Sequence, residues 1–175
     1  AFFLYIDGVH TIMALAAMFG DGIGIGQDSI ITALILVQFV AAPMTFMWSF
    51  VANKHGDKKV IFITILIYIG VVIYSMNLAT AIQFYILAGL VGSVQGGIQA
   101  SSRSLFAKII PVEKSGEFFG FYNTFGRAGS VLGPLLVNLF LVVFNDLKIA
   151  LIPLIVLFIL GAVFLWFVEE RYETI

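Results

Sequence analysis

Long apolar stretches, separated by short groups of polar and turn-forming residues, occur six times along the chain. A helix needs about 20 mostly apolar residues to cross the hydrocarbon layer of a bilayer, which is about 30 Å thick. None of the stretches alternates polar and apolar residues, as a strand of a membrane barrel would. The pattern therefore predicts six transmembrane helices, at about residues 1–19, 30–52, 60–76, 81–106, 118–144 and 149–168.

The connections between these stretches are short and contain turn-forming residues, such as Gly20-Asp21-Gly22 and Asn145-Asp146. Short loops join antiparallel neighbours, so the six helices are expected to pack into one compact bundle. We therefore predict an all-α membrane protein, a six-transmembrane-helix bundle in which residues 1–175 form a single domain.

The composition agrees with a location in the bilayer. The chain is 61% hydrophobic and 11% charged, whereas soluble domains average about 45–50% apolar and about 25% charged residues. A net charge of −1 and the lack of nucleic-acid motifs exclude a nucleic-acid partner. The chain has no cysteine, and no nucleophile–base pair or metal-ligating cluster is evident. We therefore expect no enzyme activity, no catalytic residue, no metal and no cofactor.

The basic residues give an orientation. Of the nine Lys and Arg residues, seven follow the second, fourth and sixth stretches, Lys148 lies on the other side, and Arg127 lies inside the fifth. The positive-inside rule places both termini in the cytoplasm, and Trp48 and Trp166 lie near the cytoplasmic interface that this topology predicts. The membrane is then the cell membrane, or the vacuolar membrane of a eukaryote. The seven residues are Lys54, Lys58, Lys59, Arg103, Lys108, Lys114 and Arg171.

Polar side chains are concentrated in the first, fourth and fifth predicted helices. The third and sixth contain no ionisable residue, which suits contact with lipid. A charge inside the membrane costs roughly 2.5–3.5 kcal/mol or more and usually faces a partner or a water-filled cavity. At 1.5 Å per residue the polar groups of the three helices reach comparable depths. We expect a substrate or ion pathway lined by Asp7, His10, Gln95, Gln99, Arg103, Tyr122, Asn123 and Arg127.

The same residues allow a structural interpretation. Asp7 and Arg127 could close the bundle as an ion pair, and we expect the two to approach each other in at least one conformational state. The polar residues of the fourth helix could hold neighbouring helices together, with Arg103 extending toward the cytoplasmic interface. His10 could be a hydrogen-bonded packing residue that shares one face of the first helix with Asp7.

Small residues recur at every fourth position in the fourth and fifth predicted helices. Such a series lets two helix backbones approach closely in a membrane. We therefore expect close packing along Ala88, Gly92, Gly96 and Ala100, and along Gly129 and Gly133.

Three blocks of sequence resemble a known family of membrane proteins. The chain differs from the usual pattern of that family at three positions. The family usually has Asn at the position of Ile6, Gln at that of His10 and Lys at that of Arg127. The blocks comprise residues 3–11; then 95–100, 102–104 and 106–111; then 117–123 and 126–127. The chain resembles the C-terminal six-helix half of a major facilitator superfamily transporter. More narrowly, it is similar to the autophagy-related vacuolar amino-acid effluxers and their prokaryotic relatives. Residues 52–59 resemble a degenerate form of the superfamily's basic loop signature.

This resemblance implies that the six helices are helices seven to twelve of a major facilitator fold, in which the first and fourth helices of each half line a central cavity. The implied function is secondary active transport of a small solute by alternating access, with an amino acid as the solute and protons as the coupling ion. Asp7 would carry the proton, and Gln95, Gln99 and Asn123 would contact the substrate. The expected partners are the lipid bilayer, an N-terminal six-helix half missing from this chain and a small-molecule solute. The alternative is a non-transporting membrane scaffold or a subunit of a membrane complex.

Overall fold

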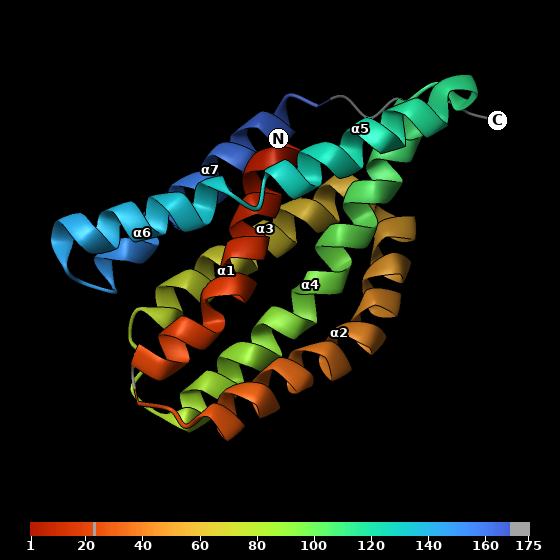
Figure 1. The fold of residues 1–175 in the computed structure, drawn as a ribbon. Coiled ribbons are helices and arrows are strands. Elements are labelled where there is room, and N and C mark those ends of the chain that lie inside the picture. Colours follow the sequence, from red (N-terminus) through yellow and green to blue (C-terminus); the bar gives the residue numbers. More distant parts are fainter. Residues whose placement is uncertain (23, 169–175) are drawn as a thin grey trace.

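The computed structural model describes residues 1–22 and 24–168, and every regular element in these ranges is a helix (Figure 1). Six segments are long and apolar enough to cross a membrane, which confirms the predicted multi-pass, six-span fold. The longer helices are α1 (Phe2–Gly22), α2 (Gln27–His55), α3 (Asp57–Ser75), α4 (Ala81–Ile109), α5 (Ser115–Ala128), α6 (Leu132–Phe144) and α7 (Ile152–Trp166). Two 3-10 turns, η1 (Val112–Lys114) and η2 (Ile149–Leu151), precede α5 and α7.

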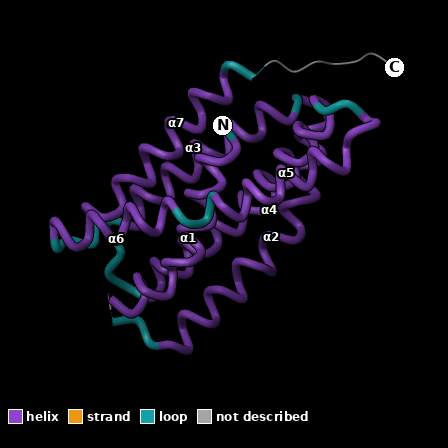
Figure 2. Tube along the Cα trace, turned by 45° about the horizontal axis from the view of Figure 1, so that its top comes forward, coloured by secondary structure: helices purple, strands orange, loops and turns teal. Residues whose placement is uncertain are grey.

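The helices run back and forth between two ends of one bundle (Figures 1 and 2). One end carries the α2–α3 turn and the α4–α5 connection, together with Lys54, Lys59 and Lys108; we call it the basic end. The other end carries the α1–α2, α3–α4 and α6–α7 connections. Arg171, which the sequence assigns to the basic end, lies outside the described residues.

The closest packing in the bundle is between α2 and α4. A Cβ atom added to Gly92 would lie 2.8 Å from the carbonyl oxygen of Val37, and one added to Gly96 would lie 3.1 Å from that of Ala41. Distances of this kind mean that the two backbones touch, because no side chain separates them. The predicted close packing along this face of the fourth span is confirmed at both glycines, with α2 as the partner.

Trp48 contributes to the same interface. Its indole Nε1 donates a hydrogen bond of 2.6 Å to the carbonyl oxygen of Ser93, and its ring fills the space beside Gly97, where a Cβ atom would lie 2.5 Å from the ring. The sequence predicts that Trp48 lies near the cytoplasmic interface; in the structure its ring is buried between α2 and α4. Because α2 continues to His55, Trp48 lies about 10 Å inside the end of its helix.

The outer helices α3 and α7 each have one buried face and one exposed apolar face. Their buried faces meet through the stacked rings of Tyr68 and Phe158, whose centroids are 5.4 Å apart. Both rings are fully buried. The exposed faces suit the lipid contact expected from the sequence, and they carry Ile63, Leu66 and Ile73 on α3 and Ile159, Val163 and Phe164 on α7.

The fifth span is two helices rather than the single helix expected over residues 118–144. Helix α5 ends at Ala128 and α6 begins at Leu132, and a short non-helical segment joins them (Figure 1). Pro134 has no N–H to donate to the carbonyl four residues earlier. The intervening Gly129, Ser130 and Val131 are weak helix formers. The first turn of α6 therefore begins inside the span, with backbone N–H groups that have no partner within the helix.

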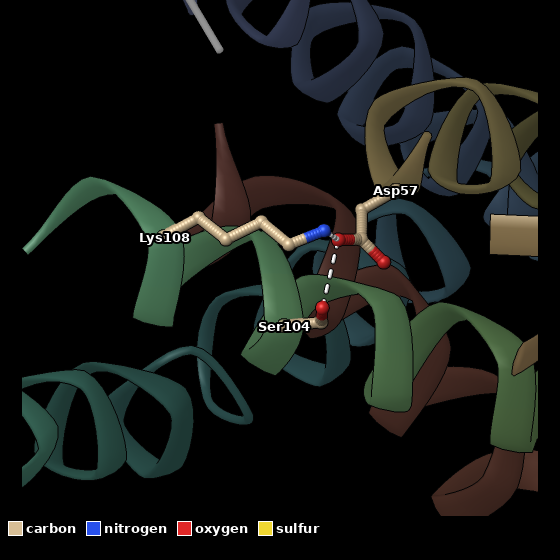
Figure 3. A network of polar contacts seen from close by, with 3 residues as sticks. All are labelled: Asp57, Ser104 and Lys108. Carbon is tan, nitrogen blue, oxygen red and sulfur yellow. Dashed lines mark hydrogen bonds and ion pairs between the residues drawn. The ribbon is translucent and has the colours of Figure 1, made fainter. Parts of the chain in front are cut away.

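A buried ion pair joins the start of α3 to the end of α4 at the basic end (Figure 3). The Asp57 side chain is only 3% exposed; its Oδ2 accepts hydrogen bonds from Lys108 Nζ at 2.6 Å and from Ser104 Oγ at 2.7 Å. Sequence reasoning missed this contact, since Lys108 was counted as an interface charge and Asp57 only as part of a loop signature.

Replacement of Lys108 by Met should lower the free energy of unfolding by about 1–2 kcal/mol, because Asp57 then keeps only the Ser104 hydroxyl and the lysine was half exposed to begin with. Unfolding of the full-length protein in detergent measures the loss. The variant Lys59→Met removes an exposed lysine nearby and should unfold like the wild type. In the double variant Asp57→Asn/Lys108→Met the buried charge is gone, so most of the stability should return; simple addition of the two single losses would contradict a direct interaction.

Candidate functional site

A pocket of about 200 Å³ lies between α1, α4 and α5 in the half of the bundle nearer the basic end. Six of its nine lining residues are among the eight that the sequence indicated for a solute or ion pathway. The six are His10, Gln99, Arg103, Tyr122, Asn123 and Arg127; the other three are Phe2, Ile6 and Gly126.

Helical periodicity places these side chains together. Residues four apart lie on the same face of a helix, and the lining residues of α1 and α4 follow this spacing without exception. On α5 the lining residues are two adjacent pairs, and the second pair follows the first by four positions. Each of the three helices therefore presents one face to the pocket. The three sets are Phe2, Ile6 and His10; Gln99 and Arg103; and Tyr122, Asn123, Gly126 and Arg127.

Aromatic contacts fix the relative positions of the three helices around the pocket. The ring of Tyr122 on α5 stacks on Phe2 of α1, with centroids 4.0 Å apart, and lies 4.6 Å from Phe106 of α4. A buried hydrogen bond of 2.8 Å links Tyr5 Oη to Ser102 Oγ, again joining α1 to α4. Sequence reasoning missed Phe2, Tyr5 and Ser102 as part of this site. The available signal was Tyr5, a side chain with a hydroxyl group inside the first apolar stretch.

The pocket carries positive charge. Arg103 and Arg127 are both exposed in the structure, and neither guanidinium forms an ion pair within residues 1–22 and 24–168. The expected ion pair between Asp7 and Arg127 does not form in this structure. Arg127 lines the pocket, whereas Asp7 lies on a different side of α1.

Asp7 is completely buried, and neither of its carboxylate oxygens has a hydrogen-bond partner in the described part of the chain. The carboxylate lies against Gly133 in the first turn of α6, where an added Cβ atom would be 3.0 Å from Asp7 Oδ2 and would also meet Thr11 Oγ1. The expectation that Asp7 and His10 share one face of α1 was therefore wrong. Positions three apart are offset by about 60° around a helix, which is enough here to direct one toward α6 and the other toward α5.

Gln95 also lies outside the pocket, one helical turn beyond Gln99. Its Oε1 atom is buried without a hydrogen-bond partner among the residues described. These ranges contain no group of three His, Cys, Asp or Glu side chains that could hold a metal ion. The chemistry that the site offers is thus hydrogen bonding and positive charge beside an aromatic wall, with a separate buried carboxylate behind α1.

Comparison with known proteins adds independent evidence. Residues 1–173 match the family described as "Vacuole effluxer Atg22 like". The chain is 42% identical over 174 residues to an uncharacterized MFS-type transporter, YxiO, of Bacillus subtilis, which covers 99% of this chain and 41% of that relative. It is 29% identical over 171 residues to autophagy-related protein 22 of Vanderwaltozyma polyspora, covering 91% and 33% of the two chains.

A third relative is the multidrug resistance protein MdtG of Proteus mirabilis, 29% identical over 181 residues that cover 99% of this chain and 44% of MdtG. The chain thus spans less than half the length of each of these three relatives. The family match extends over nearly the whole chain, and the six membrane-spanning segments agree with half of a major facilitator fold. This multi-pass membrane protein belongs to the vacuole effluxer Atg22-like family.

Proposed function

We propose that the chain forms the C-terminal half of a twelve-helix secondary active transporter, which moves a small carboxylate-bearing solute by alternating access. The observation that carries this proposal is the pocket, into which α1, α4 and α5 direct six polar side chains. The names of the relatives, an MFS-type transporter and a multidrug resistance protein among them, support transport as the general activity. An amino acid is the solute that the family resemblance implies.

The hydrogen bonds argue against the alternative of a non-transporting scaffold. A polar layer that only locks helices together should pair its side chains across helix boundaries. Within the ranges that the structure describes, the side chains of His10, Gln99, Arg103, Asn123 and Arg127 make no hydrogen bond to another residue. Their polar groups are therefore available to a solute.

Asp7 is the proposed proton carrier. Ionisable residues within membrane spans commonly form proton relays. Asp7 is fully buried, and its carboxylate oxygens have no hydrogen-bond partner among the described residues. A carboxylate in such surroundings is stable only if it can become neutral by binding a proton. Its position against the first turn of α6 supplies an environment for the ionised form as well, because the N-terminus of a helix favours negative charge.

We also propose that both termini and the basic end face the cytoplasm. The basic residues at the α2–α3 turn and the end of α4 support this orientation by the positive-inside rule. The membrane would be the cell membrane, or the vacuolar membrane in a eukaryotic source. The N-terminal six-helix half is the proposed structural partner.

Proteoliposomes that contain the full-length protein test transport and coupling together. Uptake of radiolabelled L-leucine, L-aspartate and succinate is followed with and without an imposed pH gradient. We expect at least one solute to accumulate when the gradient is present. Asp7→Asn should abolish this accumulation, because the variant lacks the proposed proton site. Solute exchange at equal pH should continue, because the pocket itself is unchanged.

The matched control is Asp28→Asn, which removes an exposed carboxylate at the opposite end of the bundle and should accumulate solute like the wild type. If the wild type accumulates none of the three solutes, the proposed transport of carboxylate-bearing solutes is wrong. Gradient-driven uptake by Asp7→Asn at the wild-type level would leave transport standing and remove Asp7 as the proton carrier.

A further inference from the structure

A second cavity, which shares no lining residue with the solute pocket, lies in the half of the bundle farther from the basic end. This inner chamber of about 60 Å³ lies between α1, α2, α3, α4 and α7 and extends about 10 Å along α1, from Phe19 to Ile12. An outer chamber of about 70 Å³ continues it toward the end of the bundle. The two chambers form one slot, because four residues line both: Phe19, Ser75, Leu78 and Leu151.

The inner chamber suits an apolar occupant. All but one of the described residues that line it are apolar. The exception is Ser75, whose hydroxyl donates a hydrogen bond of 2.7 Å to the carbonyl oxygen of Val72 in its own helix. A buried water molecule needs about two to four polar partners, and cavities without such partners stay dry. An empty cavity deprives its lining of dispersion contacts, so an apolar ligand in the slot would restore contacts that water cannot supply.

The slot opens beside the helices that face lipid. The outer chamber is lined by Met76, directly after α3, and by Leu151 in η2, directly before α7. The outward faces of α3 and α7 are apolar and exposed. An acyl chain of the surrounding bilayer can therefore enter between the ends of these two helices without crossing a polar surface.

The volume of the slot fits part of a lipid. About 10–15 Å³ of cavity volume of this kind holds one water molecule, and a methylene group is of similar size. On this scale the two chambers hold about ten methylene groups in all. That is enough for one acyl chain of medium length, while a second chain remains in the bilayer.

A positive charge lies at the mouth of the slot. Lys148 is the one charged residue among the described residues that line the outer chamber, and its side chain is exposed. Nearby Asp146 accepts a hydrogen bond of 2.7 Å from the backbone N–H of Lys148. Connections between membrane spans lie at the level of the lipid headgroups, and lysine is a common ligand of phosphate. We propose that the slot binds one acyl chain of an anionic phospholipid, with the lipid phosphate at Lys148.

Photoreactive lipids test this site in the full-length protein. The protein is reconstituted in nanodiscs with phosphatidylglycerol or phosphatidylcholine, one medium-length acyl chain of which ends in a diazirine; a free fatty acid with the same group is the third probe. Mass spectrometry locates the crosslinked residues. We expect phosphatidylglycerol to label Val71 and Leu154 in the inner chamber. It should label them about threefold more than phosphatidylcholine does, the effect of one partly exposed ion pair.

Substitutions at the two ends of the slot separate the chain from the headgroup. Ser75→Phe places a ring where the chambers meet and should abolish labelling of the inner chamber. Ile73→Phe, on the exposed face of α3, is the matched control and should label like the wild type. Lys148→Gln should remove the preference for phosphatidylglycerol, and Lys148→Arg should keep it. Thermal unfolding without probes verifies that the variants fold.

Three results would overturn binding of a phospholipid chain in the slot. They are labelling confined to exposed residues in the wild type, labelling of the inner chamber of Ser75→Phe at the wild-type level, and stronger labelling by the fatty acid than by phosphatidylglycerol. Equal labelling by the two phospholipids, or an unchanged preference in Lys148→Gln, would overturn the selection of an anionic headgroup by Lys148.

Discussion

The free energy of unfolding of the variant Gly96→Leu should be at least about 3 kcal/mol lower than that of the wild type. This loss lies at the upper end of the usual cost of overpacking a core. A Cβ atom at this position already overlaps Thr45 Oγ1 and lies 3.1 Å from the carbonyl oxygen of Ala41. A leucine side chain can be accommodated only if α2 and α4 separate, which disrupts the closest helix packing in the bundle. Unfolding of the full-length protein in detergent measures the change.

Gly89→Leu is the matched control on the same helix. An added Cβ atom at Gly89 has no other atom within 4 Å, so this substitution should change the free energy of unfolding by less than about 0.5 kcal/mol, the range of ordinary surface changes. Equal melting of the two leucine variants would mean that the small residues of α4 do not form a close interface.

The second large effect is expected at the break in the fifth span. Gly133→Ala should destabilise the protein by about 2–3 kcal/mol through overpacking, because the new methyl group would overlap Thr11 Oγ1 and press on the buried carboxylate of Asp7. Gly120→Ala on α5, where an added Cβ atom has open space, should be nearly neutral.

The double variant Gly133→Ala/Thr11→Ala separates steric overlap from a general requirement for glycine. Removal of the Thr11 hydroxyl opens space for the methyl group, so part of the lost stability should return in thermal unfolding measurements. If Gly133→Ala and Gly120→Ala have the same melting temperature, the tight contact between α1 and α6 does not exist. If the double variant is no more stable than Gly133→Ala, the overlap with Thr11 is not the cause of the loss.

The pocket was largely predictable because membrane helices restrict the possibilities. Hydropathy fixed six spans, and spacings of four residues fixed which polar side chains share a helix face, so Gln99 and Arg103 could be assigned together. What a single helix cannot reveal is its rotation relative to its neighbours. That rotation directs Asp7 toward α6 and Arg127 toward the pocket, and it separates two charges that were expected to pair.

Helix ends and contacts distant in sequence were the other source of error. The burial of Trp48 against Ser93 and Gly97 depends on how α2 faces α4, which the sequence of α2 alone does not reveal. The ion pair of Asp57 with Lys108 joins residues 51 positions apart, and no local pattern distinguishes these two charges from exposed ones. The break after Ala128 depends on Pro134, a residue that membrane helices often tolerate with only a kink.

The break between α5 and α6 has a mechanical consequence. Backbone hydrogen bonds are interrupted there, so bending at residues 129–131 is easier than within either helix. Tyr122 and Arg127 precede the joint, and Gly133, which touches Asp7, follows it. The proposed solute contacts on α5 and the proposed proton carrier beside α6 therefore lie on opposite sides of this joint. Bending at the joint would let α5 move relative to α6, so the pocket could change shape while Gly133 stays against Asp7.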